Sequence, residues 1–163
     1  MSELTHVDER GAARMVDVSQ KDVTERTARA AGTIRMTAAT LQAIRDNAVS
    51  KGDVLAVART AGIMAAKRTA DLIPLCHPLL VGAVYINFEI GDEYIEVEAQ
   101  VETVDRTGVE MEALTACAVA ALTVYDMCKS MDRAMIISDL ALWEKTGGKS
   151  GTFRRVDPNR DSH

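Results

Sequence analysis

Apolar residues recur at every second position in several parts of the chain, a period that predicts β-strands. Residues 24–36 fit this period, with Thr27, Ile34 and Met36 as strand residues. Between the next two predicted strands, Gly91-Asp92 is expected to form a hairpin turn. The remaining strand ranges are 84–90, 94–98 and one or two last strands over 135–137 and 140–143.

A period near 3.6 residues predicts helices between these strands. The first two should start at Thr37 and Asp53, whose side chains suit the N-cap position. The second is expected to end near Leu72, before Pro74. The expected apolar positions are Leu41, Ile44 and Ala48 in the first helix and Val54, Val57, Ala58, Ala61, Met64 and Ala65 in the second.

Residues 109–129 carry the strongest helix signal, because Ala, Leu and Met are frequent there. No charged residue occurs from Ala113 to Tyr125, so nearly every face of this helix should be covered by protein. The alanines between residues 116 and 121 would let a neighbouring backbone approach closely, which suggests an oligomer interface as well as a core. Alanine is also simply a good helix former, so the interface is a hypothesis.

The order of these elements predicts the fold class. Strand, helices, strand, strand, helix, strand is the split βαβ arrangement of a ferredoxin-like plait, an α+β fold with an antiparallel sheet packed against helices. The chain of 163 residues is expected to form a single domain over residues 1–163, with an arm at 1–20 and a flexible tail at 156–163. This plait hosts many activities, so the fold does not indicate the function.

Composition excludes several classes of protein. Apolar residues make up 47% and charged residues 26%, which is ordinary for a soluble globular protein. The net charge of -5 argues against a general nucleic-acid binder. No apolar run approaches the ~20 residues that span a bilayer, and no signal pattern opens the chain, so no membrane partner is expected. Three scattered cysteines fit a reducing compartment, and we expect a cytoplasmic location.

An apolar loop at residues 71–80 places His77, the only histidine away from the chain ends, beside Cys76. Pro74 and Pro78 fix their own φ and favour extended conformations before them, so His77 should lie on a stiff, non-helical segment. A titratable group on a rigid loop beside an apolar core is a candidate for chemistry. The alternative is a loop histidine that only hydrogen-bonds a carbonyl.

Charged residues stand at both ends of the long helix. Glu110 and Glu112 near its start suit the positive end of the macrodipole, and Asp126 and Lys129 share a face near its end. Caps and a surface ion pair would explain them, but carboxylates against an apolar body need a partner or a ligand. Glu112 and Asp126 are fourteen residues apart, roughly 21 Å along the axis, so no compact ligand touches both in one chain. We therefore favour a site assembled from two subunits.

Residues 147–151, with the sequence Gly-Gly-Lys-Ser-Gly, suggest a P-loop, but Trp143 stands where that motif needs a glycine. Backbone N–H groups of such a loop can still wrap a phosphate, and a flexible linker is the competing interpretation. Basic residues that include Lys67, Lys145 and Lys149 either form a pocket in this acidic protein or are solvated side chains. No metal site is expected, because the cysteines and His77 lack paired ligand spacing; the cysteines fit small hydrophobic positions.

Several segments carry a specific pattern in a fixed order. They are Met15-Val16-Asp17-Val18, Lys51-Gly52-Asp53, Ala65-Ala66-Lys67-Arg68-Thr69, Leu72-Ile73-Pro74-Leu75-Cys76-His77-Pro78-Leu79, residues 107–116, Tyr125-Asp126-Met127-Cys128-Lys129 and residues 147–151. Together they resemble the molybdenum cofactor biosynthesis protein C family, also called cyclic pyranopterin monophosphate synthase. The resemblance runs from about residue 5 to residue 155 and shows no departure at the motif positions.

The resemblance implies a lyase that converts 3′,8-cyclo-7,8-dihydroguanosine 5′-triphosphate into cyclic pyranopterin monophosphate and releases pyrophosphate. It also implies a ferredoxin-like subunit in a homohexamer, a trimer of dimers with active sites at the dimer interface. No cofactor is required, although Mg²⁺ could accompany the triphosphate.

The resemblance also suggests residue roles. The catalytic set is Lys51, Asp126 and Lys129, which would move protons. Cations suited to a triphosphate are Arg26, Lys67, Lys145 and Lys149. The residues expected to bind the rest of the substrate are Leu75, Cys76, His77, Glu110, Met111 and Glu112. A carboxylate such as Glu112 suits guanine, whose N1–H and amine both donate hydrogen bonds.

A different class of function stays open from the residues alone. A non-catalytic nucleotide- or phosphate-binding regulator on the same plait needs cations and a carboxylate that binds the base. It has no use for Asp126 paired with Lys129 beside Lys51, and that set favours an enzyme. A purely structural interaction protein would not need His77 or Glu112 either.

Overall fold

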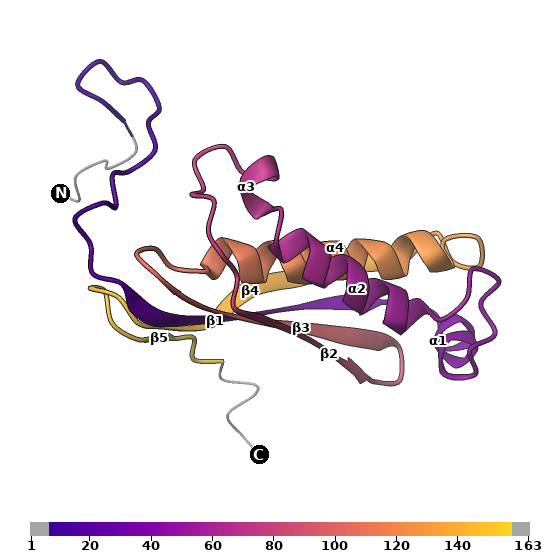
Figure 1. The fold of residues 1–163 in the computed structure, drawn as a ribbon. Coiled ribbons are helices and arrows are strands. Elements are labelled where there is room, and N and C mark those ends of the chain that lie inside the picture. Colours follow the sequence, from indigo (N-terminus) through magenta and orange to yellow (C-terminus); the bar gives the residue numbers. More distant parts are fainter. Residues whose placement is uncertain (1–6, 158–163) are drawn as a thin grey trace.

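Among residues 7–157, five antiparallel strands form one sheet, and helices cover one of its faces (Figure 1). The computed structural model describes these residues; the predictions for residues 1–6 and 158–163 lie outside them. The strands are β1 (Thr24–Arg35), β2 (Ala83–Ile90), β3 (Tyr94–Asp105), β4 (Ile136–Thr146) and β5 (Phe153–Arg154), in the spatial order β2-β3-β1-β4-β5. The predicted α+β class, with an antiparallel sheet packed against helices, is confirmed.

The first two helices, α1 (Ala38–Arg45) and α2 (Val54–Ala66), begin where the capping residues predict. The helices α3 (Thr69–Leu72) and α4 (Glu110–Cys128) follow along the chain. The side chain of Thr37 accepts a hydrogen bond from the backbone N–H of Thr40, and that of Asp53 accepts one from Ala56. Each cap satisfies a backbone donor that the first helical turn leaves free. Both predicted N-caps are therefore confirmed.

The predicted end of the second helix near Leu72 is wrong. The helix stops at Ala66, and the short helix α3 follows after Arg68, whose φ of -119° and ψ of 14° leave the helical region. The hydroxyl of Thr69 donates to the carbonyls of Ala65 and Ala66. These bonds satisfy carbonyls that a continuing helix would have used, so the chain turns several residues before Pro74.

Other boundaries also differ from the predictions. Ala48 lies beyond the end of α1 and is exposed. Val57 and Met64, expected on the buried face of α2, are 45% and 49% exposed. Gly62, which was not predicted there, is buried and packs against α4, while Ala58 is buried as predicted. The strand predicted over 94–98 continues to residue 105, and residues 153–154, for which no strand was predicted, pair with β4.

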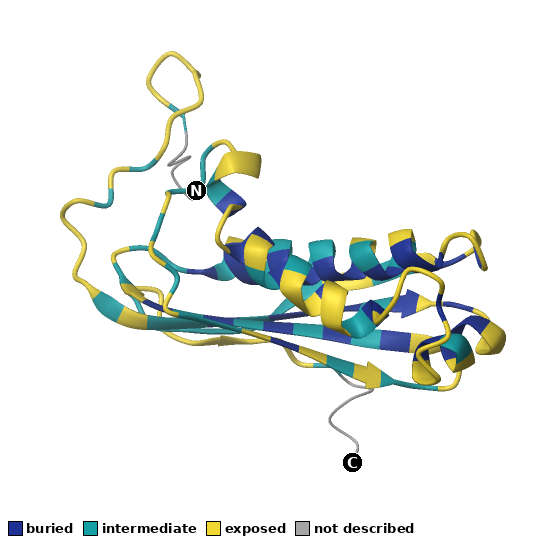
Figure 2. Ribbon diagram, turned by 45° about the vertical axis from the view of Figure 1, so that its right-hand side comes forward, coloured by how far each residue is buried: buried dark blue, intermediate teal, exposed yellow. Residues whose placement is uncertain are grey.

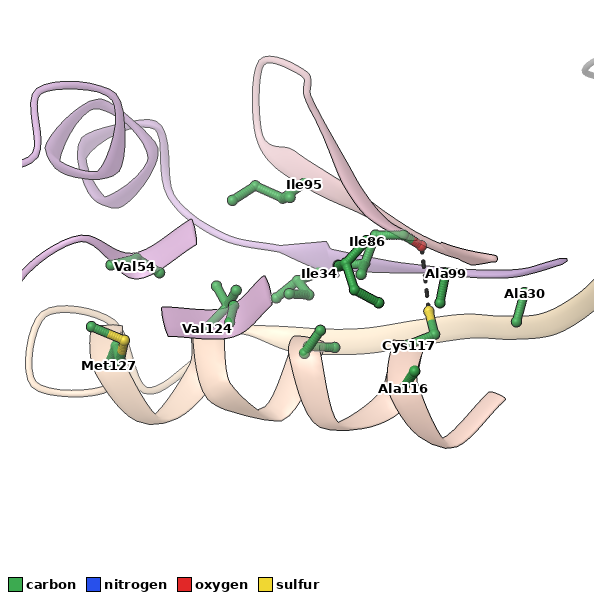
Figure 3. Packing of buried hydrophobic residues seen from close by; sticks show 14 of the residues in the cluster. Ala30, Ile34, Val54, Ile86, Ile95, Ala99, Ala116, Cys117, Val124 and Met127 are labelled. Carbon is green, nitrogen blue, oxygen red and sulfur yellow. Dashed lines mark hydrogen bonds between the residues drawn. The ribbon is translucent and has the colours of Figure 1, made fainter. Parts of the chain in front are cut away.

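The core lies between the sheet and the helices α2 and α4, whose inner faces are buried (Figure 2). Ile34 of β1 and Val124 of α4 are fully buried there (Figure 3). The thiol of Cys117 donates to the carbonyl of Val97 at 3.3 Å, which ties α4 to the central strands. Gly62 lets α2 approach α4, since an added Cβ would lie 3.0 Å from the carbonyl oxygen of Ala116. This packing sets the position of both ends of α4.

One face of α4 remains outside this core. Leu122 is 57% exposed in the single chain, so the prediction that protein covers nearly every face of the helix does not hold within one subunit. By length and composition alone α4 is long and apolar enough to cross a membrane. Its buried face packs on the sheet, as in the core helix of a globular protein.

Candidate active site

Lys51, Asp126 and Lys129 meet at the C-terminal end of α4, and we call them the lysine–aspartate cluster. One carboxylate oxygen of Asp126 lies 3.0 Å from the Nζ of Lys51, and the other lies 2.7 Å from the Nζ of Lys129. The Nζ of Lys51 also donates to the backbone carbonyl of Asp126 at 2.9 Å. The loop between α1 and α2 supplies Lys51, and its glycine, Gly52, adopts a φ of +102° that favours glycine. The structure thus brings the three predicted catalytic residues into direct contact.

The two ammonium groups control the charge of Asp126. Hydrogen bonds from Lys129 and then from Lys51 lower the pKa of Asp126 to about 2. All three side chains remain about half exposed, so a ligand could reach them from solvent. The cluster therefore combines a fixed carboxylate with two accessible ammonium groups, an arrangement suited to proton transfer.

The buried carboxyl group of Glu112 and the partly buried thiol of Cys76 form a pair at the opposite end of α4. Glu112 is 2% exposed, and its Oε1 accepts a hydrogen bond from the thiol of Cys76 at 3.6 Å. Its Oε2 is buried without a hydrogen-bond partner among the described residues. Burial raises the pKa of Glu112, and burial together with the nearby Glu112 raises the pKa of Cys76 to about 11. A buried carboxyl oxygen without a partner is costly, so a donor that reaches it when a ligand binds would stabilise it.

His77 lies on the same loop as Cys76 but faces the N-terminal arm. Its Nε2 lies 2.6 Å from the carbonyl oxygen of Val16, so the nitrogen donates to that oxygen. This contact is the one expected under the alternative interpretation of the sequence, in which His77 only hydrogen-bonds a carbonyl. Leu75 on the same loop is half-buried and Met111 on α4 is 37% exposed; contact of these residues with a substrate stays a prediction.

A cavity of about 930 Å³, which we call the basic cavity, lies near the N-terminal end of α4. Four predicted residues line it: Arg26, Glu110, Lys145 and Lys149. The start of β1, the segment between β3 and α4, and the loop before β5 meet there (Figure 1). Lys145 also hydrogen-bonds Ser150 within that loop. Clustered cations of this kind suit a phosphate chain.

Arg26 also binds backbone carbonyls at the edge of this cavity. Its Nε donates to the carbonyl of Asp105 at 2.9 Å, and its Nη2 donates to the carbonyl of Arg106 at 3.1 Å. A Cβ on Gly148 would clash with the remaining Nη1, and Gly148 adopts a φ of +76°. Arg26 therefore holds two walls of the basic cavity together, and only part of its guanidinium group is free to bind a ligand.

Several residues that line the basic cavity were not predicted from the sequence, including Lys21, Thr24 and Thr107. The Oγ1 of Thr24 is buried and has no hydrogen-bond partner among the described residues. One signal could have found Thr24, because it stands two residues before Arg26 and so lies on the same face of β1. No comparable signal marks Lys21, which lies on the irregular arm before the strand.

The predicted residues form two groups rather than one. The lysine–aspartate cluster lies at one end of α4, while Glu112 and the basic cavity lie at the other, roughly 21 Å away by the helical rise. Lys67 is exposed just after α2 and makes no ion pair with another described residue. A compact ligand held by one subunit can contact only one of the two groups.

A second cavity, larger than the basic cavity, contains none of the predicted residues. It measures about 1100 Å³ and is lined by Thr33, Arg35, Tyr94 and Glu96 near one end of the sheet. Asp132 also lines it, and its carboxylate accepts from the backbone N–H groups of Thr37 and Ala134. Because Asp132 is engaged in holding these loops, we place the chemistry in the two groups on α4. Among the described residues, no group of three or more His, Cys, Asp or Glu side chains could hold a metal ion.

Comparisons with known proteins agree on one family. A sequence model of the MoaC family matches residues 15–148. A protein of Thermomicrobium roseum named cyclic pyranopterin monophosphate synthase is 62% identical over 159 residues, 96% of each chain. Proteins with the same name occur in Heliobacterium modesticaldum, 59% identical over 96% of this chain and 100% of the relative, and, with the suffix 1, in Mycobacterium bovis, 60% identical over 93% and 90%.

Proposed function

The chain belongs to the MoaC family, and on that premise we propose that it forms cyclic pyranopterin monophosphate for molybdenum cofactor biosynthesis. The substrate is 3′,8-cyclo-7,8-dihydroguanosine 5′-triphosphate, and pyrophosphate is the leaving group, so the enzyme is a lyase. One geometric observation carries this proposal: Asp126 lies between the ammonium groups of Lys51 and Lys129, all accessible to a ligand.

The lysine–aspartate cluster supplies the proton transfers. The reaction opens one ring, builds a pterin and closes a cyclic phosphate, and each of these steps moves protons. Asp126 is ionised throughout the neutral range because its pKa is about 2, so it acts by fixing the lysines rather than by donating a proton. Lys51 and Lys129 then act as the groups that give and take protons.

The basic cavity binds the triphosphate end of the substrate. Arg26, Lys145 and Lys149 line it, and their positive charge offsets the charge of the phosphates and of the departing pyrophosphate. Lys67 is exposed and adds a cation at the end of α2. If Mg²⁺ accompanies the triphosphate, it arrives with the substrate.

The pair of Glu112 and Cys76 recognises the base. The free Oε2 of Glu112 is suited to accept from the N1–H or the exocyclic amine of a guanine-derived ring. Leu75, Cys76, His77, Glu110 and Met111 complete this side of the site as a proposal by family resemblance. Because His77 donates to the carbonyl of Val16 in the free subunit, its contact with substrate requires the arm to move or the ring to change partner.

The separation of the two groups supports a site shared between subunits. A ligand that reaches both groups must contact the cluster of one subunit and the basic cavity of another. We propose a ferredoxin-like subunit, with β5 added to the order β2-β3-β1-β4, in a homohexamer built as a trimer of dimers. The exposed Leu122 on α4 supports such an interface, and a cytoplasmic location fits a biosynthetic enzyme of this kind.

The decisive experiment supplies the purified full chain with the cyclic dihydro-GTP intermediate and measures pyrophosphate release. We expect release together with a fluorescent pterin after oxidation, and an EDTA-treated sample tests the role of Mg²⁺. Tight binding without release would instead favour a nucleotide-binding regulator. The absence of both binding and release would contradict the proposed function.

A further inference from the structure

Three of the buried polar side chains in this protein surround one loop. The loop joins α3 to β2 and contains Cys76; we call it the Cys76 loop, residues 73–82. Among the described residues, the buried polar and charged side chains are those of Thr40, Thr69, Thr103, Glu112 and Asp132. Thr69 begins α3 just before the loop, Glu112 contacts Cys76, and Thr103 binds the loop near its end. A buried polar group is costly unless it is bonded, so this grouping indicates that the position of the loop matters.

Thr103 fastens the end of the Cys76 loop to β3. Its hydroxyl donates to the carbonyl of Leu80 at 2.7 Å, and the N–H of Gly82 donates to the carbonyl of Glu102 at 2.9 Å. The ladder between β2 and β3 ends at the pair of Ala83 and Glu102, so the loop leaves the sheet at this point. The side chain of Thr103 therefore holds a carbonyl that lies beyond the last backbone pair of the ladder.

The hydroxyl bond fixes the position of the loop along β3. The side chain of Leu80 is 87% exposed, while its neighbours Leu79 and Val81 are half-buried and pack against the core. Apolar contacts are non-directional, so they hold the loop against the protein without fixing where along the strand it lies. A hydrogen bond needs its donor and acceptor in one geometry, and the bond from Thr103 to Leu80 supplies that constraint.

The position of Leu80 is passed to Cys76 by a stiff stretch of chain. Leu80 follows Cys76 by four residues, and Pro78 lies between them. The ring of Pro78 fixes its own φ and favours extended backbone at His77, so this stretch has little freedom to absorb a shift. Movement at Leu80 is therefore expected to move the thiol of Cys76, which lies 3.6 Å from the Oε1 of Glu112.

The hydroxyl of Thr69, at the other end of the loop, has a different role. It donates to the carbonyls of Ala65 and Ala66, so it binds the end of α2 rather than the loop. Of these two buried threonines, it is thus Thr103 that joins the loop to the sheet.

We propose that Thr103 is the positioning residue for the side of the site that binds the base: its hydroxyl holds the Cys76 loop where Cys76 meets Glu112. The proposal deepens the proposed function, because it rests on Glu112 and Cys76 binding the base of the substrate. Thr103 acts on a ligand only through the loop.

The first test compares two substitutions of Thr103 that differ in the hydroxyl group. Thr103→Val keeps the shape and removes the donor, whereas Thr103→Ser keeps the donor and removes a methyl group. Alkylation of Cys76 by iodoacetamide at pH 8.5 in the full chain, measured by mass spectrometry, reports the surroundings of the thiol, because burial and Glu112 raise its pKa to about 11. Thr103→Val should speed this reaction about tenfold, which corresponds to a fall of about one pKa unit. Thr103→Ser should restore the slow rate.

Thr40→Val is the matched control. Thr40 is 2% exposed, its hydroxyl is hydrogen-bonded to that of Thr37 at 2.9 Å, and it lies on α1, at the far end of the sheet from α3 (Figure 1). Both valine variants lose a buried hydrogen bond and should have a lower Tm, but Thr40→Val should leave the rate at Cys76 unchanged.

Three outcomes of this test would overturn the proposal. They are a slow rate at Cys76 in Thr103→Val, the same acceleration in Thr40→Val, and equally fast alkylation of the fully buried Cys117 in Thr103→Val, which would show that the whole fold has opened. An accelerated rate in Thr103→Ser would also contradict it, because that variant retains the donor.

The second test measures turnover of the cyclic dihydro-GTP intermediate. Thr103→Val should raise KM about fivefold, the loss expected for one hydrogen bond, and leave kcat nearly unchanged. The reason is that the pair of Glu112 and Cys76 binds the substrate, whereas the lysine–aspartate cluster moves the protons. Thr103→Ser should have the KM of the unchanged chain. A lower kcat with an unchanged KM would contradict the positioning role.

The inference and the proposed function can fail separately. If the unchanged chain releases pyrophosphate while Thr103→Val alters neither the rate at Cys76 nor KM, this inference fails and the proposed function stands. If Thr103→Val frees Cys76 and Thr103→Ser does not, but the unchanged chain releases no pyrophosphate, the positioning of Cys76 against Glu112 stands and the proposed function fails.

Discussion

The two ends of α4 hold carboxylates whose pKa values move in opposite directions. At the C-terminal end, two lysines hydrogen-bond the exposed Asp126 and lower its pKa to about 2. At the N-terminal end, burial raises the pKa of Glu112, whose Oε2 has no partner among the described residues. The same helix thus carries one carboxylate that stays ionised and one that resists ionisation.

The helix macrodipole alone would shift the two pKa values in the opposite directions. It stabilises negative charge at the N-terminus, where Glu112 lies, and opposes it at the C-terminus, where Asp126 lies. For Glu112 the dipole contributes about 0.3–1 kcal/mol, whereas leaving a buried polar group unpaired costs about 1–3 kcal/mol. Burial therefore outweighs the dipole there. At Asp126, direct contact with two ammonium groups outweighs it. Hydrogen-bond partners and burial therefore determine the pKa values of Asp126 and Glu112, and their positions on the helix do not.

The largest effect is expected at the lysine–aspartate cluster. Lys51→Ala should lower kcat by about 10²–10⁴-fold, the usual contribution of a general acid or base, while the Kd of the substrate changes little. Single-turnover kinetics and equilibrium binding check this. Arg133→Ala is the control, because Arg133 is exposed beyond the same helix end and its side chain makes no ion pair with a described residue. Loss of binding with normal turnover of the bound fraction would contradict the catalytic role.

A smaller effect is expected at the basic cavity, and it should fall on binding. Lys145→Gln should weaken substrate binding about tenfold at low salt, and the difference from the unchanged chain should shrink as salt screens the remaining charges. Titrations at several ionic strengths measure both quantities. The same Kd for the variant and the unchanged chain would remove Lys145 from the phosphate site.

Neutralising the carboxylates at the two ends of α4 should change the Tm of the protein in opposite directions. Above its ordinary pKa of 4.5, Glu112 binds more protons in the native than in the unfolded state, so it costs stability as the pH rises through its raised pKa. Glu112→Gln should therefore raise Tm at pH 7 and have no such effect at pH 4. Asp126 stabilises the fold above its ordinary pKa of 3.8, and this contribution is lost as the pH falls through about 2, so Asp126→Asn should lower Tm slightly at pH 7.

Thermal unfolding of both variants at pH 4 and pH 7 makes this comparison. A lower Tm for Glu112→Gln at pH 7 would show that the ionised carboxylate is stabilised by its surroundings, which contradicts the assignment of a buried group without a partner.

The smallest effect is expected at Cys76. Its pKa of about 11 keeps it mostly protonated, so alkylation by iodoacetamide at pH 8.5 should be slow. Glu112→Gln removes the charge of Glu112, the second cause of the raised pKa, and leaves burial, the first cause, so the alkylation rate should rise only a few-fold. Asp126→Asn at the far end of α4 should not change the alkylation rate. Mass spectrometry of the labelled thiol measures the rates. Equal acceleration by both substitutions would contradict a local coupling between Cys76 and Glu112.

Features that depend on near neighbours in sequence were predictable. The N-caps Thr37 and Asp53, the hairpin between β2 and β3, and the contact of Asp126 with Lys129 all join residues a few positions apart. Turn, cap and helix geometry fix such contacts through the backbone itself. The fold class followed because the hydrophobic period within each element is also local.

The end of α2 and the extent of β3 were not predictable in the same way. The hydroxyl of Thr69 stops α2 by binding carbonyls that a longer helix would have used, and the sequence around it reads equally well as helix. β3 continues to residue 105 because β1 pairs with it over its whole length, a partner that its own residues do not specify.

The sequence by itself indicated the strands β1 to β4, the helices α1, α2 and α4, their order and the charged residues at each end of α4, but neither α3 nor β5. Only the tertiary structure decided which distant groups meet: Lys51 with Asp126, His77 with the carbonyl of Val16, and Arg106 with the arm. Two of these contacts end on backbone carbonyls, which every residue carries and which therefore leave no mark in the sequence. The opposite pKa shifts of Asp126 and Glu112 have the same origin, because partners and burial exist only once the chain has folded.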